Sequence, residues 1–473
     1  MAKNYSTIIE NDTSASSISS VPALSIFSEI GASLDEQSPL LTNSTFDSSI
    51  CSSTNGDSVY FEEPSATIAS AAINLSNTIL GTGMLAMPAA LACVGLIPGM
   101  ALILYAGITS GLGLYFLARC AGKVGGRNAS FSSLSKLTWP KLGIFFDMAI
   151  SIKCFGVAVS YLIILGDLMP QVVRSFFHHA EEIELLMDRR FWITLSIVTA
   201  VGPLSYLRKL DSLKYTSLIA LIAVAYLVII VLYHYISPNF PPPPPESIEY
   251  FHFSTKIFSQ LPVFIFAFTC HQNIFSVHNE LQDNSEKSII KVIFSSIGSA
   301  AFIYELVAVL GYLSFGKDVL GNIILMYPQS HFVAYGRLAI VILVIFSYPL
   351  QAHPCRASID KIMDHFHQKQ PLQLQQVQDV VVINPAKRHL LVTTCIVVAS
   401  YLVAITISQL DLVLSFVGST GSTTISFILP GLFYLKLFKQ DGWDWKRCVA
   451  LFLIIYGFMV MSVCLTFNIK RLL

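Results

Sequence analysis

Charged residues are scarce in this sequence: Asp, Glu, Lys and Arg make up 12% of its 473 residues, whereas 54% are hydrophobic. Soluble domains carry about a quarter charged residues, so this composition excludes an ordinary soluble protein. The 29 basic residues equal the 29 acidic ones, and a chain without a basic excess lacks the charge that binding to nucleic acid requires. The composition therefore indicates a polytopic membrane protein surrounded by lipid.

The motifs of the common enzyme classes are also missing. The sequence contains no H-E-x-x-H, no G-x-S-x-G and no G-x-x-x-x-G-K-[ST] phosphate-binding loop. Its nine cysteines stand mostly within apolar runs and lack the close spacing of a zinc site. Asp360, Asp364, His365 and His367 have metal-binding chemistry, but they precede a Gln-rich segment and are interpreted as a solvated helical turn. We therefore expect no enzymatic activity, no metal and no cofactor.

The first 64 residues contain no long apolar core and are rich in Ser, Thr, Asn and Asp. This composition is typical of disordered chain, and it argues against a signal peptide. We therefore predict a disordered cytoplasmic tail over residues 1–64 and a membrane domain over residues 65–473.

Apolar runs long enough to cross a hydrocarbon core of about 30 Å occur repeatedly after the tail. They lie at about 67–91, 94–118, 144–173, 191–207, 215–236, 258–278, 289–315, 332–352, 389–407, 410–435 and 447–467. Basic residues are concentrated in the segments that follow the even-numbered runs. Because cytoplasmic loops carry the excess of Lys and Arg, the pattern predicts a cytoplasmic N-terminus and a C-terminus on the opposite side.

Two of these runs are interrupted by residues that do not suit a continuous helix. The run INLSNTILGTGMLAMPAAL has Gly81-Thr82-Gly83 at its middle, and LPVFIFAFTCHQNIFSVHNEL is most polar from Thr269 to Asn273. Irregular backbone persists within a bilayer only where protein or a water-filled cavity satisfies its polar groups. Spans 1–5 and 6–10 are evenly offset, so we expect two inverted repeats, with broken helices 1 and 6 forming a site near the midplane. Taken alone, the glycines of span 1 are also compatible with close helix packing.

The ends of broken helices offer complementary partners to a small zwitterion. A half-helix that begins inside the membrane presents amide hydrogens to a carboxylate, and one that ends there presents carbonyl oxygens to an ammonium or another cation. An amino acid satisfies both ends. Polar side chains at the two breaks add hydrogen-bonding groups, namely Thr78, Thr82, Thr269 and Gln272.

The motifs NLSNTILGTGMLAMP, FAFTCHQNIFSVHNEL, GYLSFG and FILPGLFYLKL resemble the amino acid/auxin permease family, particularly its fungal vacuolar amino acid transporters and the animal system A and system N transporters. The resemblance covers about residues 67–473. It implies an all-α, leucine-transporter-like fold of the APC superfamily, with a 5+5 inverted repeat, eleven transmembrane helices and an extra span 11. It also implies secondary active amino acid transport by alternating access.

The resemblance further implies which residues contact the substrate. Spans 1 and 6 carry the specific motifs, whereas span 3, around Cys154, Val157 and Tyr161, is assigned without a motif that fixes its register. The substrate-binding residues implied are Thr78, Gly81, Thr82, Gly83, Met84, Phe268, Thr269, Cys270, His271 and Tyr161.

Protons and sodium both stay open as the coupling ion, with protons favoured because vacuolar members of the family generally use them. In sodium-coupled relatives an Asn in span 1 and a hydroxyl in span 8 help to hold sodium, and the matching positions are Asn77 and Ser347. Asn77 equally suits a hydrogen bond between helices.

Ionisable residues inside spans are costly in lipid and are therefore functional candidates. Lys153 and Glu305 are the candidates for ion coupling. The Lys153 ammonium has three possible roles: it occupies a cation site, pairs with Glu305 or Asp167, or extends to the interface. His271 is a further proton-carrier candidate, because imidazole changes its charge near physiological pH.

Glu36, Leu40 and Leu41 have the spacing of an acidic dileucine sorting signal, [DE]-x-x-x-L-L. A cytoplasmic adaptor reads such a signal, so we expect location in the vacuolar, lysosome-like membrane. The plasma membrane is the alternative. Two other functions also stay open: an amino-acid-sensing receptor that uses the same pocket, and a sodium-coupled amino acid importer of the plasma membrane.

Overall fold

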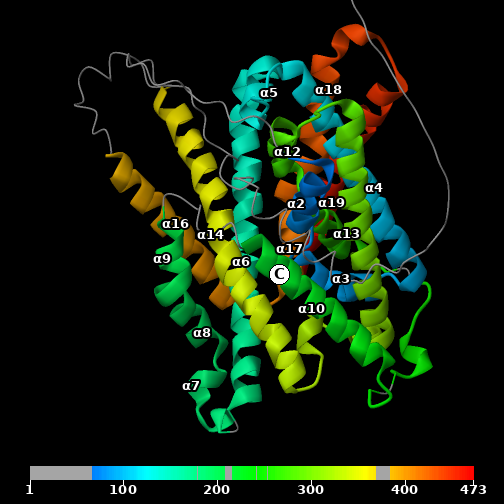
Figure 1. Ribbon diagram of the computed structural model, residues 1–473, viewed down its shortest axis with the longest axis vertical. Helices are drawn as coiled ribbons and strands as arrows, with labels where there is room; N and C mark the ends of the chain where they lie inside the picture. Colours follow the sequence, from blue (N-terminus) through cyan, green and yellow to red (C-terminus); the bar gives the residue numbers. More distant parts are fainter. Residues whose placement is uncertain (1–65, 178, 208–215, 241, 253, 369–383) are drawn as a thin grey trace, which may run out of the picture. The chain divides into compact units, whose positions relative to one another are not determined.

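The computed structural model describes residues 66–177, 179–207, 216–240, 242–252, 254–368 and 384–473 (Figure 1). The predicted tail lies outside these ranges, and so does its predicted acidic dileucine signal of Glu36, Leu40 and Leu41. Within them, eight helices are long and apolar enough to cross a membrane, or nine if one bent pair counts as a single span. The prediction of an all-helical, multi-pass membrane protein is therefore confirmed.

The longer helices follow the apolar runs of the sequence, and short helices lie between some of them. They are α2 (Ile68–Ile79), α3 (Gly83–Ala92), α4 (Leu96–Val124), α5 (Phe131–Thr138), α6 (Gly143–Phe176), α7 (Glu184–Met187), α8 (Arg189–Ser196), α9 (Gly202–Ser205), α10 (Thr216–Ile236), α11 (Ile257–Ala267), α12 (Ile274–Glu280), α13 (Glu286–Phe315), α14 (His331–Gln368), α16 (Pro385–Thr406), α17 (Leu410–Val417), α18 (Leu429–Leu437) and α19 (Trp445–Leu472). Two expected spans, 191–207 and 258–278, are divided into helical pieces and are not among these eight or nine helices. The count of eleven spans and the inverted repeat thus stay predictions.

The break that Gly81-Thr82-Gly83 predicted in span 1 is present. Helix α2 ends at Ile79, α3 begins at Gly83, and the two axes are bent by 59°. Span 6 is also interrupted: α11 ends at Ala267, and a single 3-10 turn over His271–Asn273 precedes α12. Both polar interruptions noted in the sequence therefore coincide with ends of helices.

Span 10 is irregular as well. Two π-helical segments, Gly418–Ser422 and Thr424–Ile428, lie between α17 and α18. Their wide turns accompany a run of fully buried hydroxyl side chains, which are Ser419, Ser422, Thr423 and Ser426. Span 10 thus brings polar groups into the interior of the bundle.

The long helices α6 and α14 pack along one another (Figure 1). The 38-residue α14 continues past the packed region to Asp360 and Asp364, which both pair with Arg388 of α16. These two acidic residues thus serve an ion pair between helices.

A short backbone bridge joins the beginning of span 1 to the end of span 6. The Ala66 amide donates to the Glu280 carbonyl at 3.1 Å, and the Gln282 amide donates to the Ala66 carbonyl at 3.0 Å. The Arg127 guanidinium donates to the carbonyls of Asn279 and Leu281. The carbonyls of Asn279 and Glu280, the last two residues of α12, thereby have hydrogen-bond donors.

Candidate functional site

The two breaks lie against each other. The Asn273 side-chain amide of span 6 donates to the Thr78 hydroxyl of span 1 at 2.8 Å. A Cβ added to Gly83 would lie 2.8 Å from the Cβ of Ala267, so α3 and α11 are in direct backbone contact. The chain thus brings together the two interrupted segments that lie nearly two hundred residues apart in the sequence.

The two glycines of span 1 have different surroundings. Gly83 is buried and lacks room for a side chain because of Ala267, which fits the packing interpretation. Gly81 is partly exposed, and the nearest atom to an added Cβ is the Ile79 carbonyl oxygen at 3.9 Å. Thr82 and Met84 are buried beside them. Open space at the break therefore adjoins Gly81 and not Gly83.

The span 6 segment is held by hydrogen bonds to its own backbone and to α4. The Thr269 hydroxyl donates to the Ile265 carbonyl at 2.8 Å, and the Phe268 carbonyl accepts from the Ser110 hydroxyl at 2.9 Å. Cys270 is fully buried. The side-chain carbonyl of Gln272 is buried and has no hydrogen-bond partner among the described residues, so an acceptor at this break stays available to a ligand.

His271 is fully buried behind the break and both of its ring nitrogens have partners. Nε2 lies 3.0 Å from the Ser110 carbonyl oxygen, and Nδ1 lies 3.1 Å from the Ser426 hydroxyl. A neutral ring with its hydrogen on Nε2 satisfies both contacts, since it donates to Ser110 and accepts from Ser426. A Cβ added to Gly113 would lie 2.7 Å from Nε2, so this position on α4 requires glycine. His271 thus joins α4, span 6 and span 10.

The span 3 candidates lie on α6. Lys153 is 5% exposed. Its ammonium therefore lies inside the bundle and does not extend to the interface. Asp167, one of its two expected partners, pairs with Arg189 instead, at 3.1 Å.

The residues considered for ion coupling fall into separate places. Ser347 of α14 contacts the hydroxyl of Tyr161, which also contacts Gln351. Asn77 lies on α2, half-buried. Glu305 lies on α13, and both of its carboxylate oxygens are buried without a hydrogen-bond donor in the described part of the chain.

Three residues that contact the breaks were not predicted from the sequence: Ser110, Tyr304 and Ser426. Ser426 belongs to the run GSTGSTTIS at 418–426, whose density of hydroxyl residues inside a span was a signal that could have identified it. Ser110 and Tyr304 lie in apolar helices beside Thr109 and Glu305, and no local pattern indicates that they reach the breaks.

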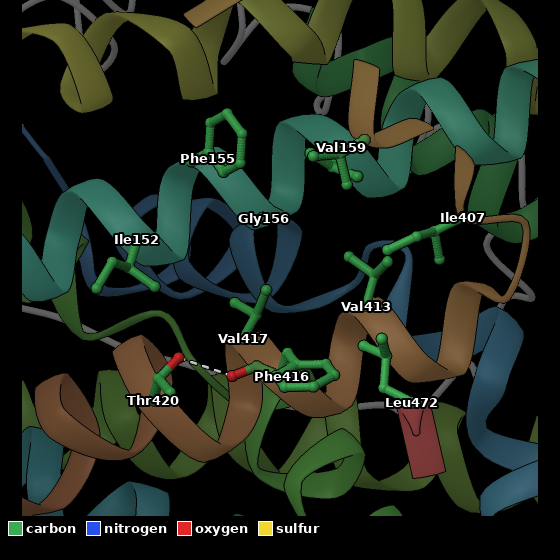
Figure 2. A pocket seen from close by; sticks show the side chains of 11 residues that line it. Ile152, Phe155, Gly156, Val159, Ile407, Val413, Phe416, Val417, Thr420 and Leu472 are labelled. Carbon is green, nitrogen blue, oxygen red and sulfur yellow. Dashed lines mark hydrogen bonds between the residues drawn. The ribbon is translucent and has the colours of Figure 1, made fainter. Parts of the chain in front are cut away.

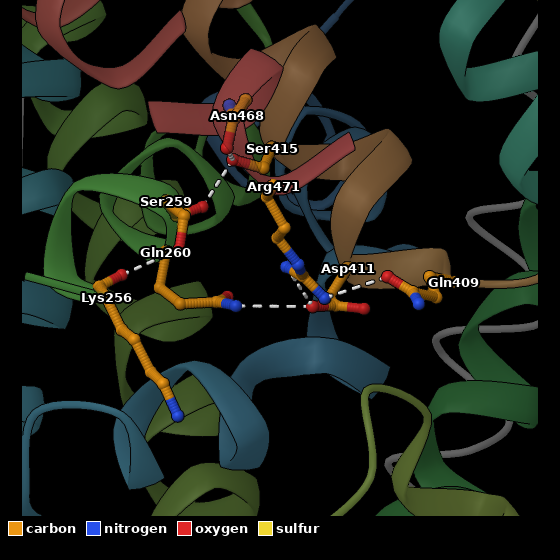
Figure 3. Close-up of polar contacts among 8 residues, drawn as sticks. All are labelled: Lys256, Ser259, Gln260, Gln409, Asp411, Ser415, Asn468 and Arg471. Atoms are coloured by element: carbon orange, nitrogen blue, oxygen red, sulfur yellow. Dashed lines mark hydrogen bonds and ion pairs between the residues drawn. The ribbon is translucent and has the colours of Figure 1, made fainter. Parts of the chain in front are cut away.

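A separate polar cluster joins α11, α17 and α19 (Figure 3). Arg471 pairs with Asp411 at 2.8 Å and donates to Gln409 at 3.0 Å. Gln260 donates to Asp411 at 3.2 Å, and the Ser415 hydroxyl bonds with Asn468 at 2.9 Å. The C-terminal end of α19 is thereby fixed to the beginning of span 10.

An apolar cavity of about 400 Å³ lies between α6, α16 and α17 (Figure 2). Ile152 and Val159 of α6 lie across it from Val413 and Val417 of α17. Among the described residues that line it, Thr420 carries the single hydroxyl group, which donates to the Phe416 carbonyl at 2.7 Å. Because the cavity offers no free polar group to a carboxylate or an ammonium, it is unsuited to a zwitterion, and the two breaks are the better candidate site.

Comparison with known proteins gives the family. The model of the transmembrane amino acid transporter protein family matches residues 64–470. Vacuolar amino acid transporter 5 of Schizosaccharomyces pombe is 43% identical over 415 residues, which cover 85% of this chain and 94% of that protein. Vacuolar amino acid transporter 6 of Saccharomyces cerevisiae is 39% identical, with coverage of 86% and 99%.

A more distant relative is the sodium-coupled neutral amino acid transporter 7 of Danio rerio, which is 28% identical over 82% of both chains. The resemblance read from the motifs of spans 1 and 6 is confirmed by these matches. They also confirm that the chain is of a transporter class and not an enzyme. This multi-pass membrane protein, with its two interrupted helices in contact, belongs to the transmembrane amino acid transporter family.

Proposed function

We propose that the protein is a secondary active amino acid transporter of the vacuolar membrane, linked to protons and working by alternating access in a leucine-transporter-like fold. The observation that carries the proposal is the contact between the two interrupted helices, with open space at Gly81 and a Gln272 acceptor that has no partner among the described residues. The names of the fungal relatives support both the substrate class and the vacuolar location.

The substrate binds with its charged groups at the helix ends. Helix α3 begins at Gly83, so the positive end of its dipole lies at the break and suits the carboxylate. The Met84 and Leu85 amides donate to the Gly81 and Thr82 carbonyls, so the amides that precede Met84 are the ones proposed to bind it. Helices α2 and α11 end at Ile79 and Ala267, and their last carbonyls suit the ammonium. Side-chain contacts come from the remaining residues proposed for the site, which are Thr78, Thr82, Met84, Phe268, Thr269, Cys270, His271 and Tyr161.

Glu305 is the proposed proton carrier. Its two oxygens are buried, and no described residue donates a hydrogen bond to either of them. Binding and release of a proton at this carboxyl group change the charge inside the membrane domain, which a proton-linked cycle requires. His271 is the second candidate. Asn77 and Ser347 stay candidates for holding sodium, because a relative is sodium-coupled by name. The ammonium of Lys153 stays a candidate for occupying a cation site itself.

Uptake into proteoliposomes tests the function directly. We expect saturable uptake of at least one of the twenty amino acids, driven by an imposed pH gradient and indifferent to a sodium gradient. Binding without saturable flux would indicate the receptor alternative. Uptake that follows the sodium gradient and ignores pH would indicate the sodium-coupled alternative.

The proposed location depends on the tail, with residues 1–64 on the cytoplasmic side and the transporter domain over 65–473. Replacing Leu40 and Leu41 by Ala should move the protein from the vacuolar membrane to the cell surface, because a cytoplasmic adaptor reads the pair as an address. Fluorescence microscopy of tagged protein measures the change. Replacing Ser38 and Thr42 by Ala is the matched control, since it alters flanking residues and keeps the motif. Unchanged vacuolar fluorescence of the Leu40, Leu41 variant would refute the proposed sorting signal.

A further inference from the structure

Tyr304 contacts both breaks at once. It lies on α13 and is fully buried. Its hydroxyl oxygen lies 2.6 Å from the carbonyl oxygen of Ile79, the last residue of α2, and 3.0 Å from that of Ala267, the last residue of α11. A single side chain from a third helix therefore holds the carboxyl ends of both half-helices together.

The ring of Tyr304 is fixed as firmly as its hydroxyl. It packs edge-to-face against Phe268, with ring centroids 5.1 Å apart, and Phe268 is itself fully buried at the span 6 break. The ring therefore has little freedom to rotate, and the position of the hydroxyl relative to the two carbonyls is defined by packing.

One hydroxyl hydrogen serves two carbonyl oxygens, each of which has two lone pairs. The two carbonyls converge on the hydroxyl and retain capacity to accept further hydrogen bonds. Both belong to helix carboxyl ends, where the helix dipoles concentrate negative potential. A group with several N–H donors and a positive charge fits such a pair, and the α-ammonium group of an amino acid is one.

We infer that Tyr304 is a positioning residue for transport: its hydroxyl keeps the carboxyl ends of α2 and α11 at the separation that lets both accept hydrogen bonds from the substrate ammonium. This inference rests on the proposed function. It gives span 7 a role in substrate binding beside the proton-carrier role proposed for Glu305, and it makes the hydroxyl of Tyr304 a determinant of substrate affinity without direct contact.

Tyr304→Phe is the test variant, because it keeps the ring against Phe268 and removes the donor. Tyr312→Phe is the matched control. Tyr312 lies two turns further along α13, is equally buried, and bonds to the backbone of Glu249 and not to a break. Both variants lose one buried hydroxyl, so any general loss of stability is common to them.

The measurement compares KM for two substrates in proteoliposomes: the amino acid that the wild type transports fastest in a panel of the twenty, and its N-methyl derivative, which lacks one N–H donor. Hydrogen bonds to a charged group are worth about tenfold or more in affinity. For wild type and Tyr312→Phe we expect N-methylation to raise KM about tenfold. For Tyr304→Phe we expect KM of the parent amino acid to rise about tenfold and the effect of N-methylation to fall nearly to none.

An equal N-methyl effect in wild type and Tyr304→Phe would overturn the inference, since a merely structural role lowers activity without changing that ratio. Absence of uptake by the wild type for all twenty amino acids would overturn the proposed function instead. If Tyr304→Phe is not recovered as a monodisperse protein, Tyr304→Met provides a flexible, donor-free side chain for the same comparison.

Discussion

Replacement of Gly81 by leucine should abolish amino acid uptake and leave a folded protein. Gly81 lies at the break of span 1, and an added Cβ meets only the Ile79 carbonyl oxygen, at 3.9 Å. Its φ lies outside the left-handed region, to which Gly95 and Gly125 belong, so leucine introduces no backbone strain there. The leucine side chain then fills the space that the substrate needs. Uptake into proteoliposomes, with gel filtration of the purified variant, measures both parts of the result.

Two neighbouring variants separate occlusion of the site from a defect in packing. Gly81→Ala adds one methyl group in open space and should retain transport. Gly83→Ala places its methyl group 2.8 Å from the Cβ of Ala267, so it should lower the thermal stability, because overpacking in a tight interface typically costs about 1–3 kcal/mol. Wild-type uptake by Gly81→Leu would mean that both glycines serve helix packing only.

The second large effect is expected for Glu305→Gln, which should eliminate proton-driven accumulation and leave exchange of labelled for unlabelled amino acid. Glutamine retains the size of the side chain but cannot bind and release a proton. Because exchange needs no net proton movement, the substrate-loaded transporter can still alternate between its inward-facing and outward-facing conformations. Uptake under an imposed pH gradient and counterflow without a gradient measure the two activities in the same proteoliposomes.

Glu286→Gln is the matched control for this experiment. Glu286 begins the same helix, α13, and pairs at the surface with Arg119 at 2.6 Å. Loss of an exposed ion pair costs at most about 1 kcal/mol, so coupling should be unchanged. Proton-driven accumulation by Glu305→Gln would exclude Glu305 as the proton carrier. His271 would then be tested by measuring uptake by His271→Gln as a function of pH.

The sequence pattern predicted the breaks well because their cause is local. Gly81-Thr82-Gly83 disfavours a continuous helix, and the polar run from Thr269 to Asn273 marks the second interruption. Residues 191–207 were predicted as one span, whereas they form two helices around a π-helical segment at Ile197–Val201. Gly202 and Pro203 follow that segment, and proline inside a helix removes a backbone donor, so this division also had a local signal.

The partners of the breaks could not be predicted in the same way. The contacts of His271 with Ser110 and Ser426 span 161 and 155 residues of sequence. The run GSTGSTTIS marks the part of span 10 that holds Ser426 but not the partner of that residue, because a hydrogen bond between distant spans depends on how the helices rotate about their axes. The sequence thus identified His271 as a candidate but gave no indication that both of its nitrogens have partners, or that Tyr304 reaches both breaks.

The bridge between Ala66 and the end of α12 has a consequence for the timing of the transport cycle. The amides of Ala66 and Gln282 keep their hydrogen bonds only while the beginning of span 1 stays in contact with the end of span 6. Any conformation in which these two segments separate exposes both amides to solvent at the same moment. Their deuterium exchange, corrected for the intrinsic rate of each amide, therefore reports how often the segments separate, and equal protection would mean that span 1 and span 6 separate in a single event.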